Sequence, residues 1–181
     1  MFAVLIGVLV LALLTFIVRE GFLGYAPRDL ACRTIGRKQQ AVIAACADTL
    51  FPAGGKITLS GTDAGLVLYF DRQFAELPRD KRMLLSLLIV FVEHAPWIFG
   101  PDRGRFTRLS REHREAAMLA MSESPIYFRR LCFLSLRTIL CMGYLANKDV
   151  ERQIGSGPNL DPFAGRPPLA PNFAPRHAMS A

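Results

Sequence analysis

Residues 79–95 read RDKRMLLSLLIVFVEHA, a charged start followed by an apolar run from Met83 to Val92. A run of this length is too short to cross a bilayer, which takes about 20 apolar residues, but it suits a helix that is buried in a protein core. We therefore expect a helix over this segment, and we expect it to form the centre of an all-α bundle.

Two amphipathic helices are expected before this segment. In residues 37–51 the apolar positions recur at the spacing of one helical face, namely at Val42, Ile43, Cys46, Thr49 and Leu50. The sequence FPAGG at 51–55 is then a helix stop. A second helix is expected to begin at Thr62, as N-cap, and to run to Leu77.

A break is expected after the central helix. The stretch from Pro96 to Gly104 holds two prolines and two glycines, which favour a loop. This loop is apolar because it contains Trp97, Ile98 and Phe99. Since exposed apolar side chains need cover, we take these three residues as candidates for contact with a partner.

Three further helices are predicted beyond the break. Ser110 is a good N-cap for the first of them. Pro125 suits the first turn of the next, which is expected to run to about Met142. Asn147 is expected to cap a short last helix, which Gly155 closes.

The first 18 residues form an apolar segment without a charged side chain. This length is near the lower limit for a bilayer span. A cleaved signal peptide would begin with Lys or Arg and end in a small-x-small site, and neither feature is present. We therefore expect residues 1–18 to be an uncleaved transmembrane anchor. A buried N-terminal helix of a soluble complex is the alternative.

Three further regions follow the predicted anchor. Residues 19–36, with glycines, a proline and scattered arginines, are expected to be a juxtamembrane linker. These basic residues would place the body in the cytoplasm by the positive-inside rule. The helical bundle is expected over 37–155. Residues 156–181 contain six prolines and are expected to be an extended tail.

The formal net charge of +7 is compatible with nucleic acid, anionic lipid or an acidic partner. Nucleic acid is disfavoured, because the sequence offers neither glycine-flanked aromatics on a sheet nor a helix-turn-helix with polar readout residues. The basic residues are densest at Arg103, Arg105, Arg108, Arg111 and Arg114. This stretch is either a docking surface for an acidic partner or lipid headgroups, or a solvated loop and helix face.

Two groups of titratable residues invite a catalytic or metal-binding interpretation. Glu93 and His94 are adjacent, so they diverge by about 100° on a helix, and we interpret His94 as a cation near a helix C-terminus. Glu112, His113 and Glu115 have no second histidine at helical spacing, and we interpret them as a solvated first turn. Since no catalytic or phosphate-binding motif is present, we expect no active site, metal or cofactor in this chain.

The four cysteines, at positions 32, 46, 132 and 141, show no C-x-x-C spacing. Cys132 and Cys141 are about 13 Å apart on one predicted helix, which is too far for a disulfide bond. We expect Cys46, Cys132 and Cys141 to be small buried apolar side chains. A disulfide between Cys32 and one of the others stays open.

Four segments carry a further pattern: Ala44-Ala45-Cys46-Ala47-Asp48-Thr49-Leu50-Phe51-Pro52; Ala64-Gly65 leading into Phe70-Asp71; Gly104-Arg105-Phe106 with Leu109; and Tyr127 to Cys141 running into Tyr144-Leu145-Ala146-Asn147, Val150 and Ile154-Gly155. In these segments, residues 36–155 resemble the gluconate 2-dehydrogenase subunit 3 family, the small subunits of flavin-dependent dehydrogenases. The Ala-Asp-Thr-Leu-Phe-Pro stretch is the most specific part of the likeness.

The resemblance implies a non-catalytic helical subunit. Such a subunit binds a large FAD-containing dehydrogenase of the glucose-methanol-choline type, which acts on alcohol or sugar CH–OH groups, and assists its folding, export or placement at the inner (plasma) membrane. FAD would belong to the partner, and a cytochrome would accept the electrons. Relatives commonly carry a twin-arginine export signal, which implies a periplasmic body; no twin-arginine pair precedes the apolar leader here.

The residues that we expect to contact the flavoprotein are Trp97, Ile98, Phe99, Arg103, Arg105, Phe106 and Arg108. A second hypothesis is a stand-alone membrane-surface protein whose basic face binds anionic lipid. A third is an enzyme that uses His94 or His113, and it is disfavoured because neither histidine has a partner at helical spacing.

Overall fold

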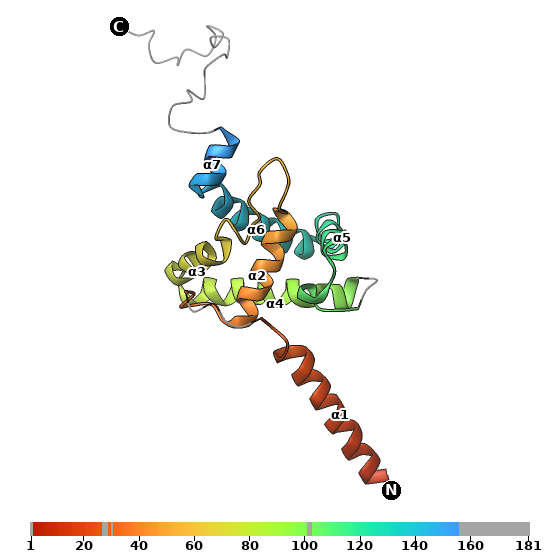
Figure 1. Cartoon of the computed structure of the whole chain (residues 1–181). Coiled ribbons are helices and arrows are strands. Elements are labelled where there is room, and N and C mark those ends of the chain that lie inside the picture. The colour runs from red at the N-terminus through yellow and green to blue at the C-terminus, as the bar shows by residue number, and fades with distance from the viewer. Residues whose placement is uncertain (1, 27–28, 30, 101–102, 156–181) are drawn as a thin grey trace, which may run out of the picture.

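The structure is a computed structural model that describes residues 2–26, 29, 31–100 and 103–155. Within these residues all regular structure is helical, which confirms the predicted all-α class (Figure 1). The predicted proline-rich tail at 156–181 lies outside the described residues. The elements are α1 Phe2–Phe22, α2 Arg37–Leu50, α3 Leu66–Glu76, α4 Arg79–Phe99, the 3₁₀ helix η1 Phe106–Arg108, α5 Arg111–Ser122, α6 Tyr127–Leu145 and α7 Lys148–Ile154.

Several predicted helix ends are confirmed by cap geometry. The Ser110 hydroxyl accepts from the backbone amide of His113 at the start of α5. The Asn147 side chain accepts from the amides of Asp149 and Val150 at the start of α7. Gly155 adopts the left-handed conformation, φ +79°, that ends a helix.

The start of α3 differs from the prediction. Thr62 does not cap the helix; a turn occupies residues 61–65, and Gly65 is the N-cap, with φ +76°. The Thr62 amide instead donates to the Asp48 carboxylate of α2. A Cβ at Gly61 would overlap the carbonyl group of Ala47, so the turn packs directly on the α2 backbone. Contact with α2 therefore overrides the local capping signal.

The predicted loop after residue 95 is also wrong. Pro96 lies inside α4, which continues through Phe99. Proline removes one backbone donor, the one that would reach the carbonyl of Val92. The Pro96 carbonyl still accepts from the Gly100 amide, and both Ala95 and Pro96 are buried. Burial of Ala95 and Pro96 offsets the lost hydrogen bond, so the helix continues and Trp97, Ile98 and Phe99 are helical residues.

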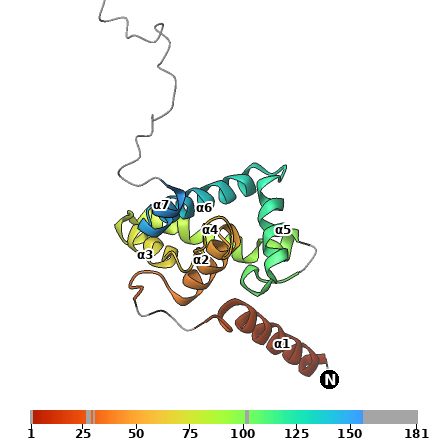
Figure 2. The same ribbon diagram turned by 45° about the horizontal axis from the view of Figure 1, so that its top comes forward.

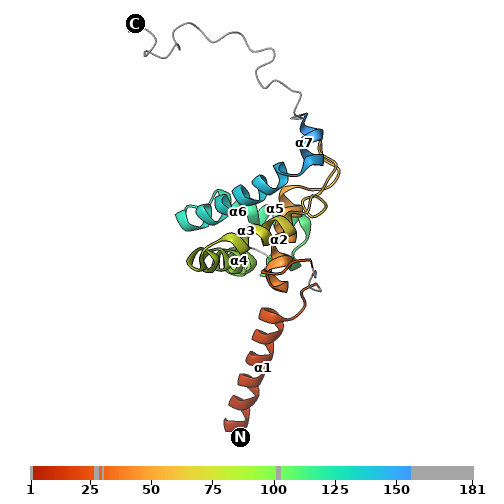
Figure 3. The same cartoon turned by 90° about the vertical axis from the view of Figure 1, so that its left-hand side faces the viewer.

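The centre of the bundle is α2 rather than α4, against our expectation. Helix α2 packs against α3, α4, α5 and η1, and its Val42, Ile43 and Cys46 are fully buried. Helix α4 is buried on one side only, through Ile89, Val92 and Glu93. Figure 3 shows why: α4 and α6 form a layer on one side of α2, and the far side of that layer is open.

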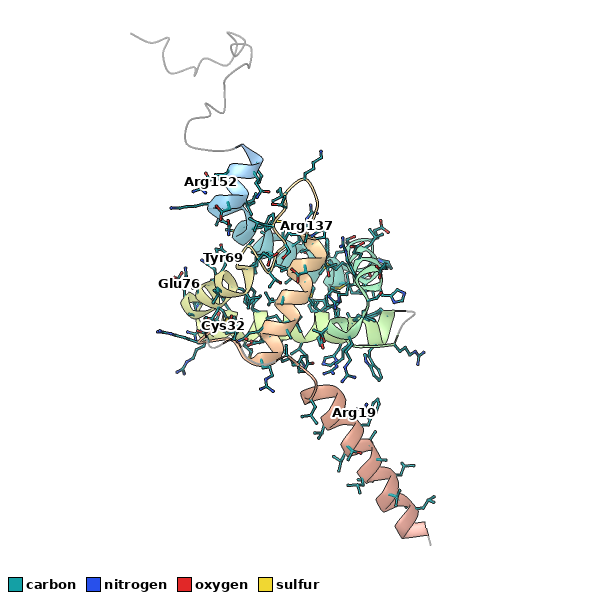
Figure 4. All side chains as sticks on the ribbon, viewed as in Figure 1. Arg19, Cys32, Tyr69, Glu76, Arg137 and Arg152 are labelled. Carbon is teal, nitrogen blue, oxygen red and sulfur yellow. The ribbon has the colours of Figure 1, made fainter. Side chains whose placement is uncertain are left out.

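Helix α1 extends away from the bundle (Figure 2). It runs to Phe22, past the predicted end at Val18, and its described side chains from Leu5 to Phe16 are all exposed. Figure 4 shows these side chains reaching outward on all sides of α1, with Arg19 near its junction with the body. The Thr15 hydroxyl donates to the carbonyls of Leu11 and Ala12, so this polar group is satisfied within the helix.

The connection from α1 to α2 is packed on the body. Cys32 and Ile35 belong to the hydrophobic core. The Asp71 carboxylate of α3 accepts from three successive backbone amides, those of Arg33, Thr34 and Ile35, at 2.8–3.0 Å. The predicted linker therefore ends in a segment that is fixed to α3.

No disulfide bond joins the four cysteines, all of which are described. Cys32, Cys46 and Cys132 are buried, whereas Cys141 is half-buried. Burial raises the pKa of the Cys46 thiol well above its ordinary value, so this thiol stays protonated.

One helix among the described residues, α4, is long and apolar enough to cross a membrane. The segment Leu5–Phe16 of α1 is apolar but shorter. Helix α4, however, packs against α2, η1 and α6.

Candidate interaction surface

The three apolar residues predicted to contact a partner point in different directions from the last turn of α4. Trp97 packs edge-on against Phe16 of α1, with ring centroids 5.9 Å apart. The guanidinium carbon of Arg129 lies over the Phe99 ring, 4.2 Å from the ring centroid. Ile98 is 71% exposed. The three side chains therefore do not all belong to one surface.

Arg105 and Phe106 are core residues, so the prediction that they contact a partner is wrong. Phe106 is fully buried in η1, and Arg105 is 1% exposed. The Arg105 Nε lies 3.9 Å from Oε1 of Glu93, which is also fully buried, and Arg105 Nη2 donates to the carbonyl of Leu23. A charge inside a protein needs a partner, and this pair provides one between α4 and the loop before η1.

Two further groups complete the surroundings of Glu93. The hydroxyls of Tyr25 and Thr107 donate to Oε1, at 3.0 and 2.8 Å, and the Thr107 amide donates to Oε2 at 3.1 Å. The Tyr25 ring also lies 4.6 Å from the Arg105 guanidinium carbon. Burial, and then the charge of Glu93, raise the pKa of Tyr25. This buried polar cluster joins the end of α1 to the bundle.

His94 points away from Glu93, as the 100° spacing predicts. Its Nε2 lies 3.0 Å from Nζ of Lys38 on α2. Burial and the charge of Lys38 lower the pKa of His94, which favours the neutral ring as acceptor. Our interpretation of His94 as a cation near a helix C-terminus is therefore wrong, because α4 continues five residues beyond it.

The arginine stretch does not form a single basic face. Arg111 pairs with Glu115 on α5, and Arg114 donates to the carbonyls of Leu109 and Thr107. With Arg105 buried, the exposed members of this stretch are Arg103, Arg108 and Arg111. The Arg111–Glu115 pair is solvated, as expected for this first turn, while His113 borders a small pocket.

The described residues hold no group of three or more His, Cys, Asp and Glu side chains that could bind a metal ion. No protein-family model, curated protein or solved structure matches this chain. The exposed side chains of the bundle are therefore the main structural indication of function.

Exposed apolar side chains follow α4 and α6, the two helices whose far side is open in Figure 3. We call this surface the outer face, and its exposed members are Met83, Leu84, Leu87 and Val90 of α4 with Tyr127, Phe128, Leu131 and Leu134 of α6. The rings of Phe91 and Phe128 meet at 5.2 Å and connect the two helices. Large apolar patches on soluble proteins usually mark a surface that another protein or a membrane covers.

Helix α6 is apolar on two opposite sides. Cys132, Leu136 and Leu140 face the core at four-residue spacing. Exposed apolar residues follow on the other side at spacings of four, three, eight and three, with the polar Thr138 inside the gap of eight: Tyr127, Leu131, Leu134, Met142 and Leu145. This double pattern was present in the sequence and is the signal that could have revealed the outer face.

A small pocket lies beside the outer face, between the end of α4, α5 and the start of α6. Its volume is about 80 Å³, and its walls include Phe99, Leu109, Ala117 and Met121. Arg129 borders it, with Nη1 donating to the Ser124 hydroxyl, and burial lowers the pKa of this guanidinium. The pocket has the apolar lining of a binding site, but its volume is small compared with the roughly 300–1,000 Å³ of ligand pockets.

Proposed function

We propose that this chain is a non-catalytic accessory subunit that binds and membrane-anchors an FAD-dependent dehydrogenase of the glucose-methanol-choline type. Two features support the proposal: the resemblance of residues 36–155 to the gluconate 2-dehydrogenase subunit 3 family, and the outer face. The outer face is the observation that carries it, because a stable small bundle has no folding reason to expose Leu84, Leu87 and Leu134 at 57–62%.

The charges beside the outer face indicate the chemistry of the partner. Residues 127–145 include Arg129, Arg130 and Arg137 and no acidic residue. A second copy of α6 would bring like charges together, which is unfavourable. We therefore expect a partner helix or surface with apolar residues bordered by Asp and Glu.

The anchoring role is assigned to α1. Its side chains from Leu5 to Phe16 are exposed, which suits surroundings of lipid and does not suit water. Its backbone is helical, and the hydroxyl of Thr15 is bonded within the helix, so no polar group would be left unsatisfied in a bilayer. The body would lie in the cytoplasm by the positive-inside rule and in the periplasm by the family resemblance.

In this proposal the chemistry belongs to the partner. FAD would be bound by the large subunit, and a cytochrome would receive the electrons. The chain itself would hold the flavoprotein at the membrane surface. The buried polar cluster around Glu93 would have a structural role, since Arg105, Tyr25 and Thr107 all direct polar groups at one carboxylate.

The test is purification of the tagged full-length chain in detergent from its native membrane. Flavin absorbance and mass spectrometry then report on what copurifies. We expect a yellow complex with a large FAD subunit. The variant Leu131→Glu/Leu134→Glu should lose the flavoprotein. Leu119→Glu is the matched control, because Leu119 of α5 is as exposed as Leu134 and lies outside the outer face.

The alternative function is a stand-alone protein that binds anionic lipid through a basic face. It would be favoured by a colourless, solitary protein in the same purification. The dispersal of the arginine stretch weighs against it, since Arg105 is buried and Arg111 is paired with Glu115. Retention of the flavoprotein by Leu131→Glu/Leu134→Glu would instead remove the outer face as the docking site.

A further inference from the structure

The contact between α1 and the end of α4 places a tryptophan at a defined position along α1. The rings of Phe16 and Trp97 meet edge to face, with centroids 5.9 Å apart. Phe16 is three residues before Arg19, the first charged residue after the apolar run. At 1.5 Å per residue, Phe16 lies about 4.5 Å deeper than Arg19 along the helix axis.

If α1 spans a bilayer, the contact with Phe16 fixes the depth of Trp97 in the membrane. The inference therefore rests on the anchoring role of α1 in the proposed function. The first charged residue after a span lies at the boundary between hydrocarbon and headgroups. Trp97 would then lie within a few ångströms of that boundary. Tryptophan is enriched at this depth, because its ring is apolar and its indole N–H can bond to headgroups or water.

The residues around Trp97 have the composition of a membrane-binding surface. Ile98 is exposed beside it on the last turn of α4. Arg103 follows α4 and is exposed, and Arg108 is exposed on η1. The Arg108 guanidinium lies against Gly24, just beyond the end of α1: a Cβ on Gly24 would be 2.9 Å from Nη2. Trp97 and the Arg108 guanidinium therefore both lie near the end of α1.

We propose that the last turn of α4 is a second, peripheral membrane contact. Trp97 and Ile98 enter the boundary region of the leaflet from which α1 emerges, and Arg103 and Arg108 bind the phosphates of lipid headgroups. The occupant is lipid because the site is continuous with the apolar surface of α1 through the Phe16–Trp97 contact and because its charges complement anionic headgroups.

The consequence is a fixed orientation of the body on the membrane. Helix α1 leaves from below the bundle, and α4 crosses above it (Figure 1). With contacts at both α1 and the end of α4, the bundle cannot turn freely about the anchor. The outer face, formed by the sides of α4 and α6, then stays open for the partner.

The sole tryptophan of the chain is a built-in probe of this contact. The full-length protein is reconstituted into phosphatidylcholine–phosphatidylglycerol vesicles that carry bromine either near the headgroup end or near the tip of the acyl chains. We expect blue-shifted Trp97 emission, with greater loss of emission from the shallow bromine than from the deep one. Emission that is unchanged by both lipids would overturn the proposal.

A second variant supplies the control. Trp97→Phe/Leu145→Trp moves the probe to the exposed end of α6, far from α1 (Figure 1), and its emission should not respond to either brominated lipid. Equal quenching at both positions would overturn the proposal, because it would mean that the whole body lies on the membrane without orientation. Shielding of Trp97 only when the flavoprotein is added would also overturn it, in favour of a protein contact.

The outcomes are separable from the proposed function. Extraction of the vesicles at alkaline pH tests whether α1 spans the bilayer. Copurification tests whether a flavoprotein binds the outer face. Ile98→Glu should reduce the quenching of Trp97 and leave both of those results unchanged, because Ile98 lies outside the outer face and outside α1.

Discussion

Helices α1 and α4 are both 21 residues long and both are rich in apolar residues, yet the chain uses them differently. The side chains of α1 from Leu5 to Phe16 are exposed all round. Helix α4 has one face in the core and one face open, and it carries the buried Glu93 near its centre. The two helices are similar in length and apolar content and differ in the arrangement of polar groups around them.

Among the substitutions that test this comparison of α1 with α4, Glu93→Ala is expected to lower the free energy of unfolding most. In Glu93→Ala, Arg105 loses its carboxylate, and the hydroxyls of Tyr25 and Thr107 lose their acceptor. Removing one partner of a buried ion pair costs about 3–5 kcal/mol. The free energy of unfolding of the body, measured by denaturant in detergent, should fall by that amount. A loss below about 1 kcal/mol would mean that α4 is not held through Glu93.

Substitutions on the two faces of α4 should differ almost as strongly in their effect on the free energy of unfolding. Ile89 is fully buried, so Ile89→Ala should cost about 2–5 kcal/mol of unfolding free energy. Leu87 is 58% exposed, so Leu87→Ala should change stability by less than about 0.5 kcal/mol. The same denaturation experiment measures both variants. Similar losses would show that the outer face is covered within the isolated chain.

A charge in α1 should act on membrane insertion and not on folding. Leu11→Arg puts a guanidinium near the middle of the apolar segment, at a cost to insertion of about 2.5–3.5 kcal/mol. The chain should shift from the membrane pellet to the soluble fraction while its unfolding midpoint stays the same. Leu87→Arg in α4 is the matched control and should stay in the pellet. The reverse result would make α4 the span.

The smallest of these effects on stability is expected from a fall in pH, which acts through His94. Burial and Lys38 lower the pKa of His94 in the folded protein, so the folded state resists protonation of this ring. As pH falls through about 6.5, the unfolded state takes up the proton first, and the stability contributed by neutral His94 is lost. NMR titration of the His94 ring should give a pKa below that of an unfolded peptide. In Lys38→Gln the pKa of His94 should rise; an unchanged pKa would show that Lys38 does not lower it and would leave burial and the charge of Arg105 as the causes.

Local signals were sufficient for most helix ends. Ser110 and Asn147 cap helices by hydrogen bonds that span two or three residues, so sequence alone reveals them. Pro96 and Thr62 misled the prediction because tertiary packing decides both sites. A proline is tolerated in a helix where the proline itself is buried, as Pro96 is, and Thr62 does not cap α3 because its amide donates to Asp48 of α2.

The candidate site could be predicted only in part. The sequence indicates that Trp97 and Ile98 are apolar residues in need of cover. It gives no sign that Arg105 and Phe106 are buried, since arginines in a basic run are usually exposed. Arg105 pairs with the Glu93 carboxylate of α4. No pattern in the sequence indicates that these two residues are in contact. The outer face was overlooked because a helix with two apolar sides was interpreted through its core side alone.

The carboxylate of Asp71 has a consequence for encounters at a membrane. By accepting from three successive amides, it fixes residues 33–35, just before α2, to α3. If α1 spans a bilayer, this restraint would leave the body fewer orientations relative to the membrane. An encounter with a partner in the same plane would then have less orientation to search.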